Sequence, residues 1–262
     1  MDWGYKAMLT TVTVALVLVV AQTMGRRLAG MLAGLPVITA PALLWIAAEQ
    51  GAGFAARCAV GSIAACGVMA VFALTYERLS RRLGPGSTLL LSLAVGALIA
   101  MPMTLLGDRP LRAITLTAVL CGAVILLLPI AARADQMRRI RGEIAFTAVA
   151  AGAVSVMVSL GARELGPFWS GLLASLPIIS VAALVTQHLA AKHDSIQRFL
   201  RGYVVGLVGK AVFALAFAAS VVQIGAPLAV TAALAIGLGA ALCAAHGLSL
   251  LEQRAIARVV TA

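Results

Sequence analysis

Long apolar runs, separated by short clusters of charged residues, extend along the whole 262-residue chain. Of all residues, 62% are hydrophobic and only 11% are charged. The hydrocarbon core of a bilayer is about 30 Å thick, and a helix crosses it with about 20 apolar residues. A soluble domain of this length does not contain such runs, so the sequence predicts an all-α polytopic membrane protein.

Nine runs are long enough to be placed as spans, with ends uncertain by a few residues. They cover residues 7–24, 28–48, 54–76, 87–106, 111–130, 143–161, 168–190, 199–221 and 227–250. The longest connection, a polar linker at about 131–143, leaves no room for a separate domain. The first run is expected to be a retained span, because a cleaved signal peptide would have a more basic start and a small-x-small cleavage site.

The basic residues lie in short clusters between the apolar runs. This pattern is typical of topology signals and argues against nucleic-acid binding, despite a net charge of +11. One side of the membrane receives fourteen Lys and Arg residues and the other side five, while Lys210 lies inside a span. The positive-inside rule then places the N-terminus outside and the C-terminus in the cytoplasm of a multi-pass inner-membrane protein. The larger group is Arg26, Arg27, Arg78, Arg81, Arg82, Arg133, Arg138, Arg139, Arg141, Lys192, Arg198, Arg201, Arg254 and Arg258, and the smaller is Lys6, Arg57, Arg109, Arg112 and Arg163.

The sequence also contains an internal repeat. Residues 30–44 read GMLAGLPVITAPALL, and residues 171–185 read GLLASLPIISVAALV, at an offset of 141. Over 30–100 against 171–241 there are 20 identities in 71 positions, including a shared AVFAL run. We interpret this as a duplication, with repeat one at 1–106, a bridging helix and cytoplasmic linker at 107–142, and repeat two at 143–262.

Five spans separate equivalent points of the two copies, so the copies are expected to have opposite orientations. Their loop charges agree, because the loop after the third span carries Arg78, Arg81 and Arg82, whereas its equivalent at 223–226 carries no charge. Inverted-topology repeats are a recurring plan of secondary transporters, with the substrate site near the midplane between the repeats.

Pro36 and Pro177 occupy equivalent positions in the second and seventh predicted spans. A proline inside a helix removes a hydrogen bond and clashes with the preceding turn, whereas it suits the first turn of a new helix. Pro36 lies about 13 Å and Pro177 about 15 Å into the membrane, from opposite faces. The alternative is a simple packing kink, but we predict broken helices in the second and seventh spans, around residues 33–37 and 174–178, whose half-helix N-termini point at the centre.

Small and hydroxylated residues surround each proline. Gly34 and Ser175 precede the two prolines and ease a break, while Thr39 and Ser180 follow three residues later and can satisfy freed backbone groups. These four residues and the two prolines are candidate substrate-binding residues.

Lys210 is the only charged residue deep inside a predicted span, about 16 Å from its cytoplasmic end. It shares a helix face with Gly202 and Gly206, which predicts that it points into the protein. Met69 is its equivalent in the first copy. An intramembrane ionisable residue is a functional-site hypothesis by default, and the alternative is a neutral lysine held by backbone carbonyls.

Other chemically active residues give weaker signals. The four cysteines all lie in apolar segments without metal-ligand spacing and are interpreted as buried thiols. Glu49, His188, His246 and Gln187 lie near span ends, where capping or solvation is the ordinary role. We find no HExxH, GxSxG or Walker-type motif, so we predict no catalytic residue, no metal, no cofactor and no enzymatic activity.

Residues 35–41, LPVITAP, resemble the LPxxTxPF signature that urea channels carry in each half. Urea channels are also inverted repeats. Ala42 stands where that signature has Phe, the second copy reads LPIISVAA, and the chain has no NPxxG. The resemblance implies a passive path for a small neutral solute.

Three functions therefore remain open. Two positive half-helix ends and a lysine favour a transporter of a small anion, either a carboxylate, a phosphate-bearing metabolite or a lipid head group. The second is a passive channel for urea or an amide, and the third is a membrane assembly partner that transports nothing. The expected partners are the bilayer and a small-molecule substrate, and a homo-oligomer is left open.

Overall fold

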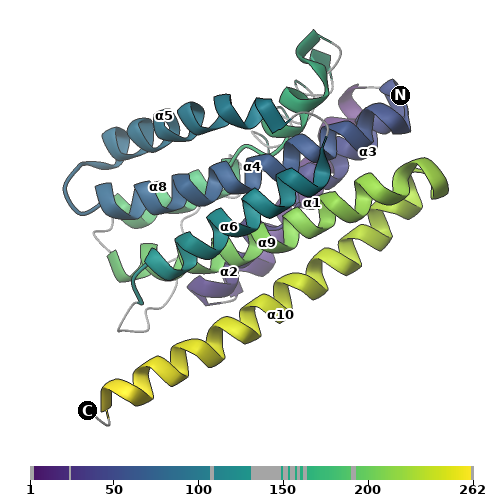
Figure 1. The fold of residues 1–262 in the computed structure, drawn as a ribbon. Helices are drawn as coiled ribbons and strands as arrows, with labels where there is room; N and C mark the ends of the chain where they lie inside the picture. The colour runs from purple at the N-terminus through teal and green to yellow at the C-terminus, as the bar shows by residue number, and fades with distance from the viewer. Residues whose placement is uncertain are drawn as a thin grey trace.

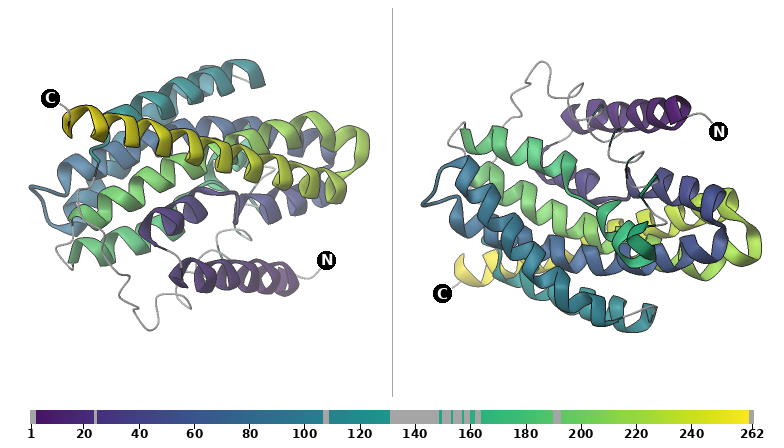
Figure 2. Two further views of the ribbon diagram at one scale, coloured as in Figure 1. Left: turned by 90° about the horizontal axis from the view of Figure 1, so that it is seen from below. Right: turned by 90° about the horizontal axis from the view of Figure 1, so that it is seen from above.

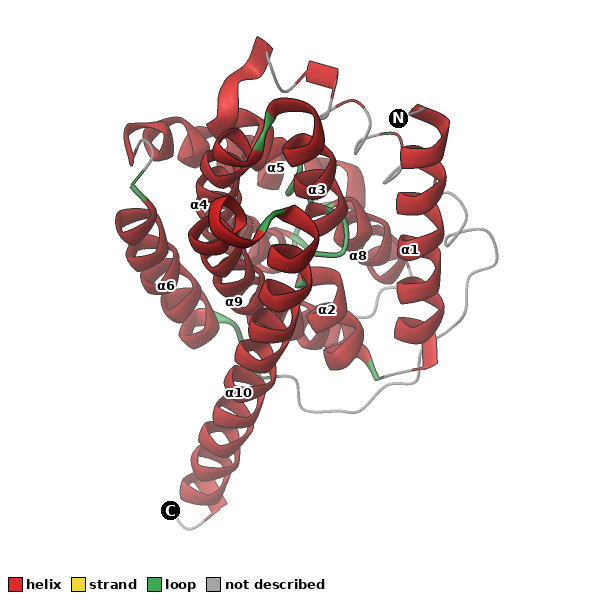
Figure 3. Ribbon diagram, turned by 90° about the vertical axis from the view of Figure 1, so that its right-hand side faces the viewer, coloured by secondary structure: helices red, strands yellow, loops and turns green. Residues whose placement is uncertain are grey.

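The computed structural model describes residues 3–23, 25–106, 109–130, 164–189 and 193–260, together with the single residues 149, 153, 157, 160 and 161. All secondary structure in these residues is helical (Figure 3). In chain order the labelled elements are α1 (Trp3–Thr23), α2 (Arg26–Gly34), α3 (Thr39–Gln50), α4 (Ala52–Leu79), α5 (Pro85–Met103), the short 3-10 helix η1 (Thr104–Leu106), α6 (Pro110–Leu127), α8 (Ile178–Leu189), α9 (His193–Ile224) and α10 (Ala226–Val260). Residues 164–173 form a further helical segment before α8.

Six helical stretches among the described residues are long and apolar enough to cross a membrane. They are Arg26–Gln50, Ala52–Leu79, Pro85–Met103, Pro110–Leu127, His193–Ile224 and Ala226–Leu251. These stretches confirm the prediction of an α-helical membrane protein. The predicted linker at 131–143 and most of the predicted span at 143–161 lie outside the described residues.

The long helices α4 and α9 form the centre of the bundle (Figures 1 and 3). The apolar window of α4 is 83% buried, whereas the corresponding windows of α5, α6 and α10 are 22–28% buried. Most large side chains on these outer helices are apolar, including Leu98, Val119 and Leu238. A helix that exposes apolar residues around most of its circumference is suited to lipid, so α5, α6 and α10 are placed to face the bilayer. Helix α1 lies at the side of the bundle, beside α2 (Figure 2).

The prediction that all four cysteines are buried is wrong for one of them. Cys58, Cys66 and Cys121 are buried, but Cys243 is exposed. Cys243 lies on the outer face of α10, beside the exposed Leu242. An apolar segment in a membrane protein has no need to bury every thiol, because lipid is as apolar as a protein core.

Glycines bring helix backbones into direct contact at two crossings. At the crossing of α2 with α9, a Cβ atom added to Gly30 would lie 2.0 Å from the carbonyl oxygen of Phe199, and one added to Gly202 would lie 1.9 Å from that of Arg27. Gly34 and Gly206 face each other one turn further along. Small residues spaced by four let membrane helices approach in this way.

The second crossing joins the helical segment 164–173 to α4 and uses the same contacts. A Cβ atom added to Gly171 would lie 1.8 Å from the carbonyl oxygen of Cys58, and one added to Gly61 would lie 2.2 Å from that of Phe168. Each of these four residues lies 141 positions from its counterpart in the α2–α9 crossing. In each crossing, the helix that precedes the predicted break of one copy therefore packs against the long helix of the other copy.

Candidate functional site

Both predicted helix breaks are present in the structure. Helix α2 ends at Gly34, Leu35 is extended with φ −69° and ψ 163°, and α3 begins at Thr39. Helical hydrogen bonding resumes when the amide of Ala40 donates to the carbonyl of Pro36 at 2.8 Å. Pro36 therefore sits at the entry to a new helix, where its missing N–H costs no hydrogen bond.

The second break has the same form. The helical segment ends at residue 173, residues 174–177 are not helical, and α8 begins at Ile178. The amide of Val181 donates to the carbonyl of Pro177 at 2.8 Å, which matches the bond at Pro36. A simple bend of two continuous helices is thus the wrong interpretation of these prolines.

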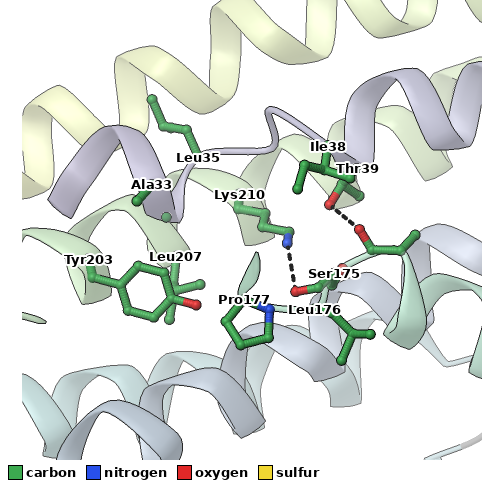
Figure 4. Close-up of a pocket in the computed structure, with 12 residues that line it drawn as sticks. Ala33, Leu35, Ile38, Thr39, Ser175, Leu176, Pro177, Tyr203, Leu207 and Lys210 are labelled. Carbon is green, nitrogen blue, oxygen red and sulfur yellow. Dashed lines mark hydrogen bonds between the residues drawn. The ribbon is translucent and has the colours of Figure 1, made fainter. Parts of the chain in front are cut away.

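The two breaks touch each other across 135 residues of sequence. The hydroxyl Oγ1 of Thr39, at the start of α3, donates to the carbonyl oxygen of Ala174 at 3.1 Å (Figure 4). Thr39 is 1% exposed, so this hydrogen bond is shielded from water. It satisfies a carbonyl that the end of the helical segment leaves without an intrahelical partner.

A small cavity lies between the breaks and α9. Its volume is about 20 Å³, and one water molecule needs about 10–15 Å³ on the same scale. In this conformation the cavity can hold water but is too small for a metabolite. The twelve lining residues are Ala33, Gly34, Leu35, Ile38, Thr39, Ala174, Ser175, Leu176, Pro177, Tyr203, Leu207 and Lys210.

Five of the seven residues predicted from the sequence line this cavity, namely Gly34, Thr39, Ser175, Pro177 and Lys210. The other two, Pro36 and Ser180, are buried at the same breaks but are not among the lining residues. The structure thus brings together residues that the sequence placed in three separate spans.

Lys210 projects from α9 into the cavity (Figure 4). The residue is 6% exposed, and its Nζ lies 3.5 Å from the carbonyl oxygen of Ser175, at the outer limit of a hydrogen bond. No carboxylate of the described residues pairs with the ammonium group. The Ser175 carbonyl follows the C-terminus of the helical segment, where the helix dipole favours a cation.

Sequence reasoning missed the side chains that complete the cavity. Tyr203 and Leu207 lie on α9 seven and three residues before Lys210, and all three line the cavity. This i, i+4, i+7 spacing was the available signal. The small residues at 202 and 206 form a second face with Lys210, and the prediction in this helix rests on that face.

A second group of polar contacts lies away from the cavity, at the C-terminal end of α4. Glu77 is 4% exposed and accepts hydrogen bonds from Arg81 Nη2 at 2.6 Å and from Gln197 Nε2 at 3.1 Å. The sequence placed Glu77 just beyond its span, but α4 continues to Leu79 and buries it. Gln197 comes from α9, so the contact links the two predicted repeats.

His188 and Gln187, which were expected at a solvated span end, lie in the last turn of α8. The hydroxyl of Tyr76 lies 3.3 Å from Nδ1 of His188, and Gln187 is 2% exposed. The expectation that Gln187 is peripheral is therefore wrong, because the C-terminal end of α8 packs into the bundle. Glu49 and His246 are exposed, and the described residues contain no group of three His, Cys, Asp or Glu side chains suited to a metal.

No family model, curated protein or solved structure matches the chain.

Proposed function

We propose that the protein is an inner-membrane transporter of nine spans, built from two inverted repeats that meet at the cavity between the broken helices. The paired crossings support this proposal, since Gly30 on Phe199 and Gly171 on Cys58 are the same contact shifted by 141 residues. Such reciprocal contacts are what a two-fold axis between the copies would produce. Broken helices between repeats are also where transporters of this plan bind substrate.

The substrate that we propose is a small anion with a carboxylate or phosphate group, either free or in a lipid head group. The observation that carries this proposal is the buried Lys210 ammonium, which has no carboxylate partner among the described residues. A cation at membrane depth is costly unless a counter-charge offsets it. The N-termini of α3 and α8 begin beside the same cavity and add partial positive charge. Because the cavity has room only for a water-sized molecule in this conformation, substrate entry requires the breaks to separate.

Ligand stabilisation of the detergent-purified protein tests this proposal directly. Small carboxylates, inorganic phosphate and head-group phosphates should raise the thermal unfolding midpoint in a saturable way, because binding to the folded state stabilises it by mass action. Urea and acetamide at the same concentrations should have no effect. A midpoint that responds to the neutral solutes but to none of the anions would reject the anion site and favour a passive channel.

Cysteine labelling in whole cells tests the inverted arrangement. Single cysteines introduced at residues 107–112 should react with an impermeant thiol reagent from outside, and those at 132–141 only after the membrane is opened. The expectation follows from the distribution of Lys and Arg between the two sides. Labelling of both segments from the same side would contradict nine spans and, with them, the opposite orientation of the repeats.

A further inference from the structure

Polar side chains join the corner between α8 and α9, in the second copy, to the end of α4 in the first copy. The Tyr76 hydroxyl lies 3.3 Å from Nδ1 of His188, in the last turn of α8. Nε2 of Gln197, in α9, donates to Oε1 of Glu77 at 3.1 Å, and both of these side chains are buried. The end of α4 is therefore bonded to both helices of the corner.

A third contact completes this group. Nε2 of His193, the first residue of α9, lies 2.9 Å from the carbonyl oxygen of Ser80. A carbonyl oxygen only accepts, so the imidazole is the donor. The rings of His188 and His193 lie 6.3 Å apart between centroids, which makes the three contacts one continuous group. We call its members the corner cluster, and they are Tyr76, Glu77, Ser80, His188, His193 and Gln197.

The internal repeat supplies a second corner for comparison, between α3 and α4 at the opposite end of the bundle. Its residues lie 141 positions from those of the corner cluster, and all six are apolar. Phe217 and Val221 are buried in the apolar core, and the four alanines pack against that core. One end of the bundle is thus joined by hydrogen bonds and the other by apolar packing. The six equivalents are Ala47, Ala52, Ala56, Phe217, Ala218 and Val221.

Helix α8 connects the corner cluster to the cavity. It begins at Ile178, directly after the cavity-lining Pro177, and ends at Leu189, about 18 Å away along the helix. A movement of the corner therefore moves one wall of the cavity. Water can replace the hydrogen bonds of the corner cluster when they separate, whereas exposing the apolar corner to water is unfavourable. The polar end is the one suited to reversible opening.

We propose that the corner cluster is the gate between the cavity and the cytoplasm. The distribution of Lys and Arg assigns this end of the bundle to the cytoplasm. Separation of α8 from α4 opens the gate and gives the cavity the room that a substrate needs, while the apolar corner keeps the opposite end closed. The proposal rests on the inverted repeat and the orientation of the proposed function but not on its anionic substrate.

Cysteine reactivity inside the cavity tests the gate without any substrate. Leu207→Cys, in a Cys243→Ser background, places a thiol on the cavity wall, and the first copy already has Cys66 at the equivalent position. Gln197→Glu then sets a second carboxylate against Glu77, and at pH 8 the two like charges repel. The rate of reaction with an impermeant maleimide should rise about tenfold or more in inside-out vesicles and stay unchanged in right-side-out vesicles.

Three further variants make the test specific. Adding Glu77→Gln to Gln197→Glu exchanges the amide and the carboxylate, so the reaction rate should return to that of the starting protein. His193→Ala removes the bond to Ser80 without adding charge and should also raise the rate from the cytoplasmic side. Thr117→Val is the matched control, because it removes a buried bond between α6 and α4, to the carbonyl of Ile63 at 2.9 Å, and should leave the rate unchanged.

The outcomes separate the gate from the proposed function. Unchanged rates from both sides in Gln197→Glu and His193→Ala, or equal rates in these variants and Thr117→Val, reject the gate alone. A rise from the outer side instead overturns both the gate and the orientation on which it rests. A wrong anion proposal leaves every rate as expected, because no carboxylate or phosphate ligand enters the experiment.

Discussion

Lys210→Met should reduce anion binding and transport by about 100-fold or more, because removing one partner of a buried charge pair costs about 2–5 kcal/mol. The same variant should fold and insert at least as well as the unmodified protein. A lysine at the centre of a bilayer costs about 2.5–3.5 kcal/mol on insertion scales, and its only hydrogen bond within the described residues is the long one to Ser175. Methionine is the residue that the first copy already has at the equivalent position, Met69.

The deciding measurement is thermal stability and anion response in one preparation. Lys210→Arg is the informative companion variant, because the planar guanidinium keeps the charge but differs in shape from a compact ammonium. We expect it to restore activity only in part. If Lys210→Met retains full activity, or if it unfolds the protein, the lysine has a structural role and the anion site is wrong.

Gly171→Leu should destabilise the protein by about 3 kcal/mol or more, since overpacking costs about 1–3 kcal/mol even where side chains can shift. Here the clash is with backbone, because the first added carbon would lie 1.8 Å from the carbonyl oxygen of Cys58. The crossing between the segment 164–173 and α4 cannot form at its present distance. The break at 174–177 would then move away from Thr39, and ligand response should be lost together with stability.

Gly122→Leu on α6 is the matched control. It is also a helical glycine, but a Cβ atom there meets nothing within 4 Å, so leucine should be neutral or slightly stabilising through its better helix propensity. Unfolding midpoints in the same detergent compare the two variants. Equal midpoints would mean that the glycine crossings do not hold the two copies together.

Much of the site was predictable because its signals are local. The LAGLP and LASLP segments predicted breaks at the observed places, since proline and its small neighbours act on their own turn of helix. Lys210 stood out for the same reason, as a single charge in an apolar run. Gly202 and Gly206, on its face, predicted correctly that it points inward, where they contact α2.

Other features depended on which helices meet, and no local signal carried them. The burial of Glu77 results from Gln197 on α9 lying against the end of α4, and the cavity wall formed by Tyr203 results from the close approach of α9 to Gly34. The exposure of Cys243 likewise follows from the peripheral place of α10 (Figure 1). An apolar sequence is compatible with either a lipid-facing or a buried position, because both environments are equally apolar.

The sequence by itself determined the membrane class, the two breaks and the buried lysine, because span length, proline geometry and the cost of an intramembrane charge are properties of single segments. Only the tertiary structure decided that the breaks touch through Thr39 and Ala174 and that Lys210 reaches Ser175. It also decided that no described residue donates a hydrogen bond to the carbonyl oxygens of Ala33 and Gly34. These pairings join residues more than thirty to more than a hundred positions apart, and they form because glycines let the backbones of distant helices approach within van der Waals contact.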